Sequence, residues 1–158
     1  MVRRLITKFI GEILLSGGAI TREQLDQALA YQKEHGGLLG QILVQFGYVT
    51  EEDVALSLTA QYGFPYLPLD NYEIDGGVMN LIPRRVARQY CLIPVDRVGN
   101  ALTVAMADPT NNQAIEDIET LTNCVVQTFV STPSDIRKAI DRYYKPDTNG
   151  SSPAGTAS

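Results

Sequence analysis

The chain has 158 residues, of which 44% are hydrophobic and 20% are charged, and its formal net charge is −5 at pH 7. This length allows one moderate domain or two small ones. The negative charge argues against a non-specific nucleic-acid binder, because such proteins usually carry a basic face. No apolar run approaches the roughly 18 residues of a membrane helix, and no secretory leader is recognisable. We therefore expect a cytoplasmic chain with no direct membrane insertion.

A motif at residues 9–32 recurs without a gap at residues 38–61. Many equivalent positions in the two copies carry the same residue type. Examples are Gly11 and Gly40, Gly18 and Gly47, Thr21 and Thr50, Leu29 and Leu58, and Gln32 and Gln61. A repeat of this kind indicates a duplicated structural unit. We therefore expect residues 1–63 to contain two similar units.

Each copy predicts a helix, a turn with glycine and a second, capped helix. Gly17-Gly18 ends the first helix, because glycine adopts the left-handed cap conformation without a Cβ penalty. Thr21 with Gln24, and Thr50 with Asp53, show the capping-box spacing that starts a helix. Four helices in two similar pairs predict an N-terminal four-helix bundle built from two tandem helical hairpins.

Residues 64–145 have the pattern of a small α/β subdomain. Two prolines after residue 63 end the helical pattern. A strand from Cys91, a tight turn at residues 98–100 and a strand at residues 101–106 indicate a hairpin. Further expected elements are helices at 83–89, 112–121 and 133–144, and a strand at 124–130. The expected fold class is α+β with a mostly antiparallel sheet, followed by a disordered tail or linker at residues 146–158.

The sequence has no recognisable catalytic constellation. It lacks a phosphate-binding loop of the G-x-x-x-x-G-K-[ST] type and any metal-ligand spacing. The one histidine, His35, is expected at a solvated helix end. Cys91 and Cys124 lie in apolar runs and are expected to be buried, reduced thiols. We therefore predict that the chain is not an enzyme and requires no metal or cofactor.

Two interpretations of the repeat remain open. In the first, its leucines form a core, its threonines cap helices and its glycines form turns, and it has no further role. In the second, Gly11, Gly40, Gln32 and Gln61 form two pseudo-symmetric sites. Glycine near a helix start leaves N–H groups open to an anion, although it costs about 1 kcal/mol of helix propensity. Such a pair would suit a twofold-symmetric dianion.

The doubled motif, followed by the segments at 70–75, 82–87 and 102–110, resembles the N-terminal, MshEN-type domain of type II secretion and type IV pilus assembly ATPases. Some members of that family bind cyclic di-GMP through two tandem motifs, each holding one half of the ligand. Others dock the ATPase onto a cytoplasmic partner of the inner-membrane platform. The resemblance implies a non-catalytic regulatory module whose partners are the motor ATPase or a platform protein, and no nucleic acid.

The resemblance also implies a set of ligand-binding residues. In the first motif these are Phe9, Ile10, Gly11, Leu14, Gly18, Leu25, Leu29 and Gln32. In the second motif they are Leu38, Leu39, Gly40, Leu43, Gly47, Val54, Leu58 and Gln61. In some relatives the second subdomain also approaches the ligand, and Asp108 is the matching residue here.

Phe9 and Leu38 stand where the binding members carry arginine. An arginine there could stack on guanine and donate charge-assisted hydrogen bonds, which contribute about 1.5–3 kcal/mol each. Phe9 can still stack, whereas Leu38 offers neither a charge nor a ring. This departure weakens the prediction of cyclic di-GMP binding. It leaves open the alternative of a docking domain that binds its partner without nucleotide.

Overall fold

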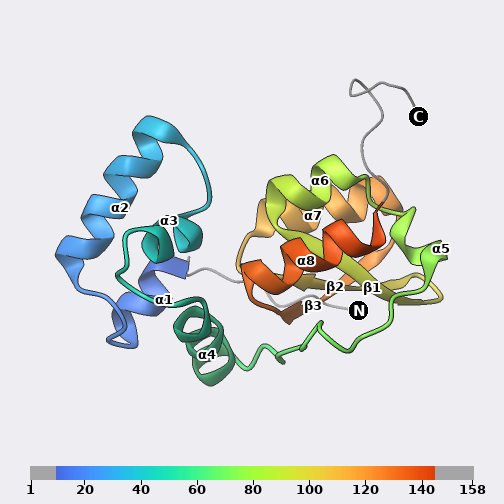
Figure 1. Ribbon diagram of the computed structural model, residues 1–158, viewed down its shortest axis with the longest axis horizontal. Coiled ribbons are helices and arrows are strands. Elements are labelled where there is room, and N and C mark those ends of the chain that lie inside the picture. Colours follow the sequence, from blue (N-terminus) through green and yellow to red (C-terminus); the bar gives the residue numbers. More distant parts are fainter. Residues whose placement is uncertain (1–9, 145–158) are drawn as a thin grey trace.

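The computed structural model describes residues 10–144. Two groups of elements lie side by side (Figure 1): helices from residues 10–62, coloured blue to teal, and a three-stranded sheet with the helices from residues 76–143. The candidate residue Phe9 and the tail predicted at residues 146–158 lie outside the described residues.

The first group contains α1 (Ile10–Ser16), α2 (Arg22–His35), α3 (Leu39–Gln45) and α4 (Glu51–Tyr62). Both predicted capping boxes are present. The Thr21 hydroxyl accepts a hydrogen bond from the Gln24 N–H while the Gln24 side chain accepts one from the Thr21 N–H, and Thr50 and Asp53 make the same exchange. These bonds satisfy N–H groups that have no partner within the helix. The arrangement of the four helices as a bundle of tandem hairpins stays a prediction.

The sheet has the order β1-β2-β3, with β1 (Leu92–Val98), β2 (Ala101–Met106) and β3 (Val125–Val130). β1 and β2 form the predicted antiparallel hairpin, whereas β2 and β3 pair in parallel. The prediction of a mostly antiparallel sheet is therefore not confirmed. The physical reason is α7 (Asn112–Thr122), a helical crossover that lets β3 start at the same end as β2. A mixed α+β fold is confirmed.

The remaining helices are α5 (Gly76–Met79), α6 (Arg84–Tyr90) and α8 (Pro133–Tyr143). α5, α6 and α8 contact β1, α8 also contacts β2, and α7 contacts β3. The sequence did not predict α5, because four residues that begin Gly-Gly show no helical periodicity. Thr132 caps α8 by accepting a hydrogen bond from the Asp135 N–H at 3.3 Å, and Pro133 occupies the first turn, where proline is well tolerated.

Buried side chains form two clusters. One lies among α1–α4 and includes Val130 at the end of β3, and the other lies among the sheet and α5–α8. Val130 thus joins the end of the sheet to the helical cluster. The division into units at residue 63 stays a prediction. Cys91 and Cys124 are buried and free, as predicted.

No helix within residues 10–144 is long and apolar enough to cross a membrane. The same stretch holds no group of three or more His, Cys, Asp or Glu side chains placed to bind a metal ion.

Candidate functional site

A pocket lies where α1, α3 and α4 meet the loop after β2 and the start of α8. Predicted ligand-binding residues that line it are Ile10, Leu38, Gly40, Val54 and Asp108. The other lining residues are Gln41, Val44, Glu51, Ala55, Ala107, Ser131 and Pro133. The structure therefore brings together parts of both motif copies and a residue from the second group of elements.

The two motif glycines at the helix starts lie under side chains of the opposite copy. Leu39 Cδ2 lies 2.9 Å from the point where a Cβ on Gly11 would stand, and Ile10 Cδ1 lies 3.4 Å from that point on Gly40. Ile10 and Leu39 are equivalent in the repeat, so the contact between α1 and α3 is reciprocal. Leu25 Cδ1 approaches the same point on Gly11 to 2.7 Å. In this structure, the close approach that glycine permits is therefore made by neighbouring helices.

The two motif glutamines each bind a backbone carbonyl. Gln61 Nε2 donates to the Ile13 carbonyl at 3.1 Å, and a Cβ on Gly17 would clash with the same nitrogen. Gln32 Nε2 donates to the Gly37 carbonyl at 3.0 Å. Because these carbonyls are not at equivalent positions of the repeat, the pseudo-symmetry does not extend to the glutamines.

Most of the remaining motif residues belong to the core and the turns. The buried leucines are Leu14, Leu25, Leu43 and Leu58. Gly18 and Gly47 lie in exposed turns at φ 79° and 78°, a conformation that favours glycine. Leu29 is 41% exposed on α2. The structure does not bring these residues to the pocket.

Asp108 opens the turn that leads into α7. Its carboxylate accepts hydrogen bonds from the Thr110 N–H at 3.0 Å and from the Thr110 hydroxyl. Burial raises the pKa of Asp108 above its ordinary 3.8, and the bonds from Thr110 oppose that shift. The pocket therefore contains a poorly solvated carboxylate that gains from any additional hydrogen-bond donor.

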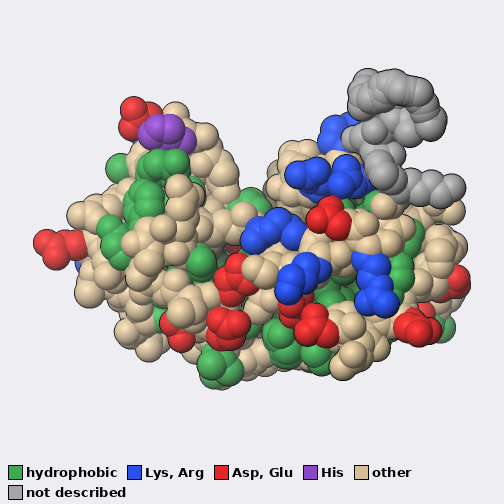
Figure 2. All heavy atoms as spheres, in the orientation of Figure 1, with side chains coloured by type: hydrophobic (Ala, Val, Ile, Leu, Met, Phe, Trp, Pro, Cys, Tyr) green, Lys and Arg blue, Asp and Glu red, His purple; other side chains and the backbone are tan. Residues whose placement is uncertain are grey.

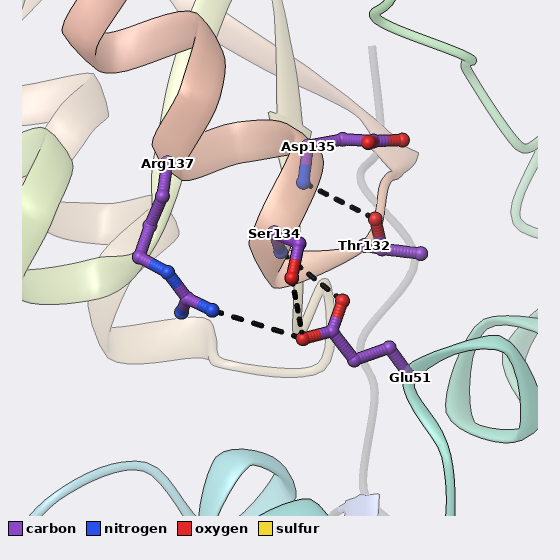
Figure 3. A network of polar contacts seen from close by, with 5 residues as sticks. All are labelled: Glu51, Thr132, Ser134, Asp135 and Arg137. Carbon is purple, nitrogen blue, oxygen red and sulfur yellow. Dashed lines mark hydrogen bonds and ion pairs between the residues drawn. The ribbon is translucent and has the colours of Figure 1, made fainter.

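Glu51 lines the same pocket, although the sequence did not single it out. Its two carboxylate oxygens accept hydrogen bonds from the Ser134 N–H at 3.1 Å and the Ser134 hydroxyl at 2.9 Å (Figure 3). Arg137 Nη2 lies 3.7 Å from the same carboxylate. Ser134 lies in the first turn of α8, where backbone N–H groups lack helical partners and the dipole favours an anion. No local signal could reveal this contact, because the two residues are 83 positions apart.

The charged side chains among the described residues that line the pocket are both acidic. Glu51 and Asp108 line it, whereas no Lys or Arg is among its described lining residues. Leu38, at the second position where the binding members carry arginine, contributes an apolar wall. On the face seen in Figure 2, Lys and Arg side chains gather mainly over α6 and α8.

The model of the MshEN domain family matches residues 62–150, which is more than half of the chain. The chain belongs to the MshEN domain family. The matched residues include the sheet and α5–α8 of this MshEN domain, whereas the tandem motifs precede them.

Two curated relatives match a longer part of the chain than the family model does. The type IV pilus assembly ATPase PilB of Myxococcus xanthus is 36% identical over 135 residues, which cover 85% of this chain and 24% of the relative. PilB of Thermus thermophilus is 32% identical over 139 residues, covering 87% of this chain and 16% of the relative. The MshEN domain described here thus spans a quarter or less of these relatives.

Two solved structures share the fold. The structure of MshE with cdg is 28% identical, has a TM-score of 0.66 and covers 87% of this chain and 99% of its own. The N-terminal domain of XpsE is 26% identical, has a TM-score of 0.71 and covers 92% of this chain and 100% of its own. The resemblance inferred from the doubled motif is confirmed.

Proposed function

We propose that this MshEN domain is a non-catalytic, cytoplasmic regulatory module of a pilus or secretion motor and that it binds cyclic di-GMP. The proposed site is the pocket between the tandem motifs and the loop after β2. The observation that carries the proposal is the convergence of Ile10, Leu38, Gly40, Val54 and Asp108 on one pocket. The similar structure of MshE contains cyclic di-GMP. The partner served would be a motor ATPase or a protein of the inner-membrane platform.

The lining chemistry suits a guanine base. Guanine carries N–H donors on its Watson–Crick edge, and a carboxylate accepts from two such donors at once. Asp108 would accept in this way, and added donors would stabilise its ionised form against the cost of burial. Ile10 and Val54 would contact the apolar face of the ring. In this proposal the two helix pairs act as one tandem-hairpin bundle, with each copy holding half of the ligand.

Calorimetric titration of cyclic di-GMP into the full chain tests the proposal. Asp108→Ala should weaken binding by about tenfold or more, the equivalent of one charged hydrogen bond. Glu116→Ala, an exposed carboxylate on α7, is the matched control and should bind as the wild type does. The absence of heat with the wild type at high micromolar ligand would contradict the proposal. Equal affinities of Asp108→Ala and the control would contradict the placement of the guanine.

The charge of the pocket favours a second candidate function, which is protein docking without nucleotide. Two carboxylates line the pocket and Leu38 stands where the binding members carry arginine. Among the lining residues that the structure describes, the two phosphates of cyclic di-GMP would therefore find no Lys or Arg. In that case the domain would bind a motor or platform protein from the same genome equally well with and without cyclic di-GMP. A binding assay with purified partner, with and without the nucleotide, separates the two functions.

A further inference from the structure

We propose that the contact of Glu51 with Ser134 and Arg137 holds the tandem motifs against α8 and keeps anions out of the pocket. We call this contact the latch. When the latch breaks, the pocket opens. The identity of the anion rests on the proposed function, whereas the latch itself does not.

The contact joins two parts of the fold that are distant in sequence. Glu51 is the first residue of α4, and Ser134 and Arg137 lie on α8. The Glu51 side chain is 18% exposed and that of Arg137 is 55% exposed. Arg137 therefore reaches the contact from the solvent side, whereas the Glu51 carboxylate is mostly covered by protein.

Glu51 is also one of four residues that line two neighbouring pockets. The ligand pocket described above and a second pocket that contains Gln45 and Arg137 share Gln41, Val44, Glu51 and Pro133 as lining residues. Since Glu51 stands in the shared wall, rotation of its side chain away from Ser134 would join the two hollows. The same rotation would remove a negative charge from the path of an anionic ligand.

Cys91 provides a chemical reporter beside the latch. Its thiol is 3% exposed, and burial raises its pKa to about 11. Gln41 donates a hydrogen bond to this thiol, and Gln41 lines both pockets, so the thiol lies close behind their shared wall. Release of Glu51 should therefore expose Cys91. Cys124 is also buried, 4% exposed, and lies just before β3, where its thiol donates to the Thr122 carbonyl at 3.5 Å.

The first experiment measures alkylation of Cys91 by N-ethylmaleimide in the full chain carrying Cys124→Ser. Glu51→Ala should accelerate labelling by about tenfold or more, as expected for a local opening, and Arg137→Ala should do so to a smaller extent. Glu52→Ala is the matched control, because it removes a neighbouring acid from the same helix turn, and it should label at the wild-type rate. Rates measured over a series of pH values separate access to the thiol from a change in its pKa.

The reciprocal background, Cys91→Ser, reports on Cys124. Its labelling should not change in Glu51→Ala if the opening is local. Acceleration of both thiols by the same factor would show a general loss of structure and would overturn the latch. An unchanged Cys91 rate in Glu51→Ala would overturn it as well.

The second experiment asks whether the latch controls the pocket. Glu51→Gln keeps an acceptor for Ser134 but removes the charge, and it should bind cyclic di-GMP at least about fivefold more tightly than the wild type, within the usual range of coupling between sites. Equal affinities would overturn the control of the pocket by Glu51. If no variant binds the nucleotide while Cys91 labelling still responds to Glu51→Ala, the proposed ligand is wrong and the latch stands.

Discussion

Leu39 Cδ2 lies 2.9 Å from the point where a Cβ on Gly11 would stand, so the start of α3 packs directly on the backbone of α1. Ile10 packs on Gly40 in the reciprocal way, at 3.4 Å. Contacts between equivalent positions are those that a twofold relation produces at an isologous interface. Gly11 and Gly40, which the sequence predicted to lie beside a ligand, thus have a packing role in the structure.

This packing predicts unequal effects at the two glycines. Gly11→Ala should destabilise the fold by about 1–2 kcal/mol, because overpacking against Leu25 and Leu39 outweighs the gain in helix propensity. In Gly40→Ala the new Cβ would lie 3.4 Å from Ile10 Cδ1, which is an ordinary contact distance. This variant should leave the free energy of unfolding unchanged or raise it by up to about 1 kcal/mol. Denaturant unfolding of both variants measures the difference. Equal stabilities would contradict the reciprocal but unequal packing.

The Gln61 amide over Gly17 predicts a coupled pair. Gln61→Ala should cost about 0.5–1.5 kcal/mol, because the Ile13 carbonyl loses a hydrogen bond. Gly17→Ala should cost a similar amount by displacing the same amide, since the Cβ would stand where the amide nitrogen lies. The double variant should therefore be no less stable than either single variant. A double-mutant cycle of unfolding free energies checks this, and simple additivity would contradict it.

The features that sequence reasoning recovered are local. Thr21 and Thr50 cap helices through residues three positions away, so the spacing alone carries the information. The parallel pairing of β2 with β3 was missed, although the helix predicted between them already pointed to a crossover. The contact between Glu51 and Ser134 could not be predicted, because a carboxylate in a first helix turn is explained locally by the dipole and its partner depends on the tertiary fold.

Among the predicted ligand-binding residues that the structure describes, only five line the pocket. Motif matching placed Ile10, Leu38, Gly40, Val54 and Asp108 on one list, and these residues do line one pocket. Matching to a motif does not distinguish residues that bind a ligand from residues that pack in the core. Leu14 and Leu58 are fully buried, so their place in the motif is explained by packing. The proposed role of the pocket residues in ligand binding stays a prediction.

Removal of a capping hydroxyl should measurably destabilise the fold. Thr50→Ala removes the side-chain acceptor for the Asp53 N–H, 3.0 Å away, and should lower the free energy of unfolding by about 1 kcal/mol. Thr50→Ser keeps the hydroxyl and should restore most of that loss. Urea unfolding of the three proteins tests the cap. An alanine variant as stable as the wild type would show that α4 is held by packing alone.

The raised pKa of Asp108 predicts a pH-dependent stability. Because this carboxyl binds its proton more tightly in the folded chain than its ordinary pKa of 3.8 implies, its stabilising contribution is fully present below that value and is lost as the pH rises through the folded-state pKa. Asp108→Asn keeps an acceptor for Thr110 and removes the buried charge. The variant should therefore be more stable than the wild type at neutral pH and equal to it at about pH 3. The free energy of unfolding of both proteins, measured from about pH 3 to pH 7, tests this prediction. A difference between them that does not change with pH would contradict the raised pKa of Asp108.

Restoration of the missing cation should reveal whether Leu38 faces the ligand. Leu38 is half-buried, lines the pocket and packs against the cluster among the sheet and α5–α8. The aliphatic stem of an arginine can keep that packing while its guanidinium reaches the pocket. Leu38→Arg should then tighten cyclic di-GMP binding by about ten- to a hundredfold, the equivalent of one charged hydrogen bond of about 1.5–3 kcal/mol. Leu38→Gln, which donates hydrogen bonds without a charge, should gain much less, and Leu38→Met should gain nothing. Calorimetry on the three variants tests whether Leu38 faces the ligand. An arginine variant that binds no better than the methionine variant would show that the ligand binds elsewhere.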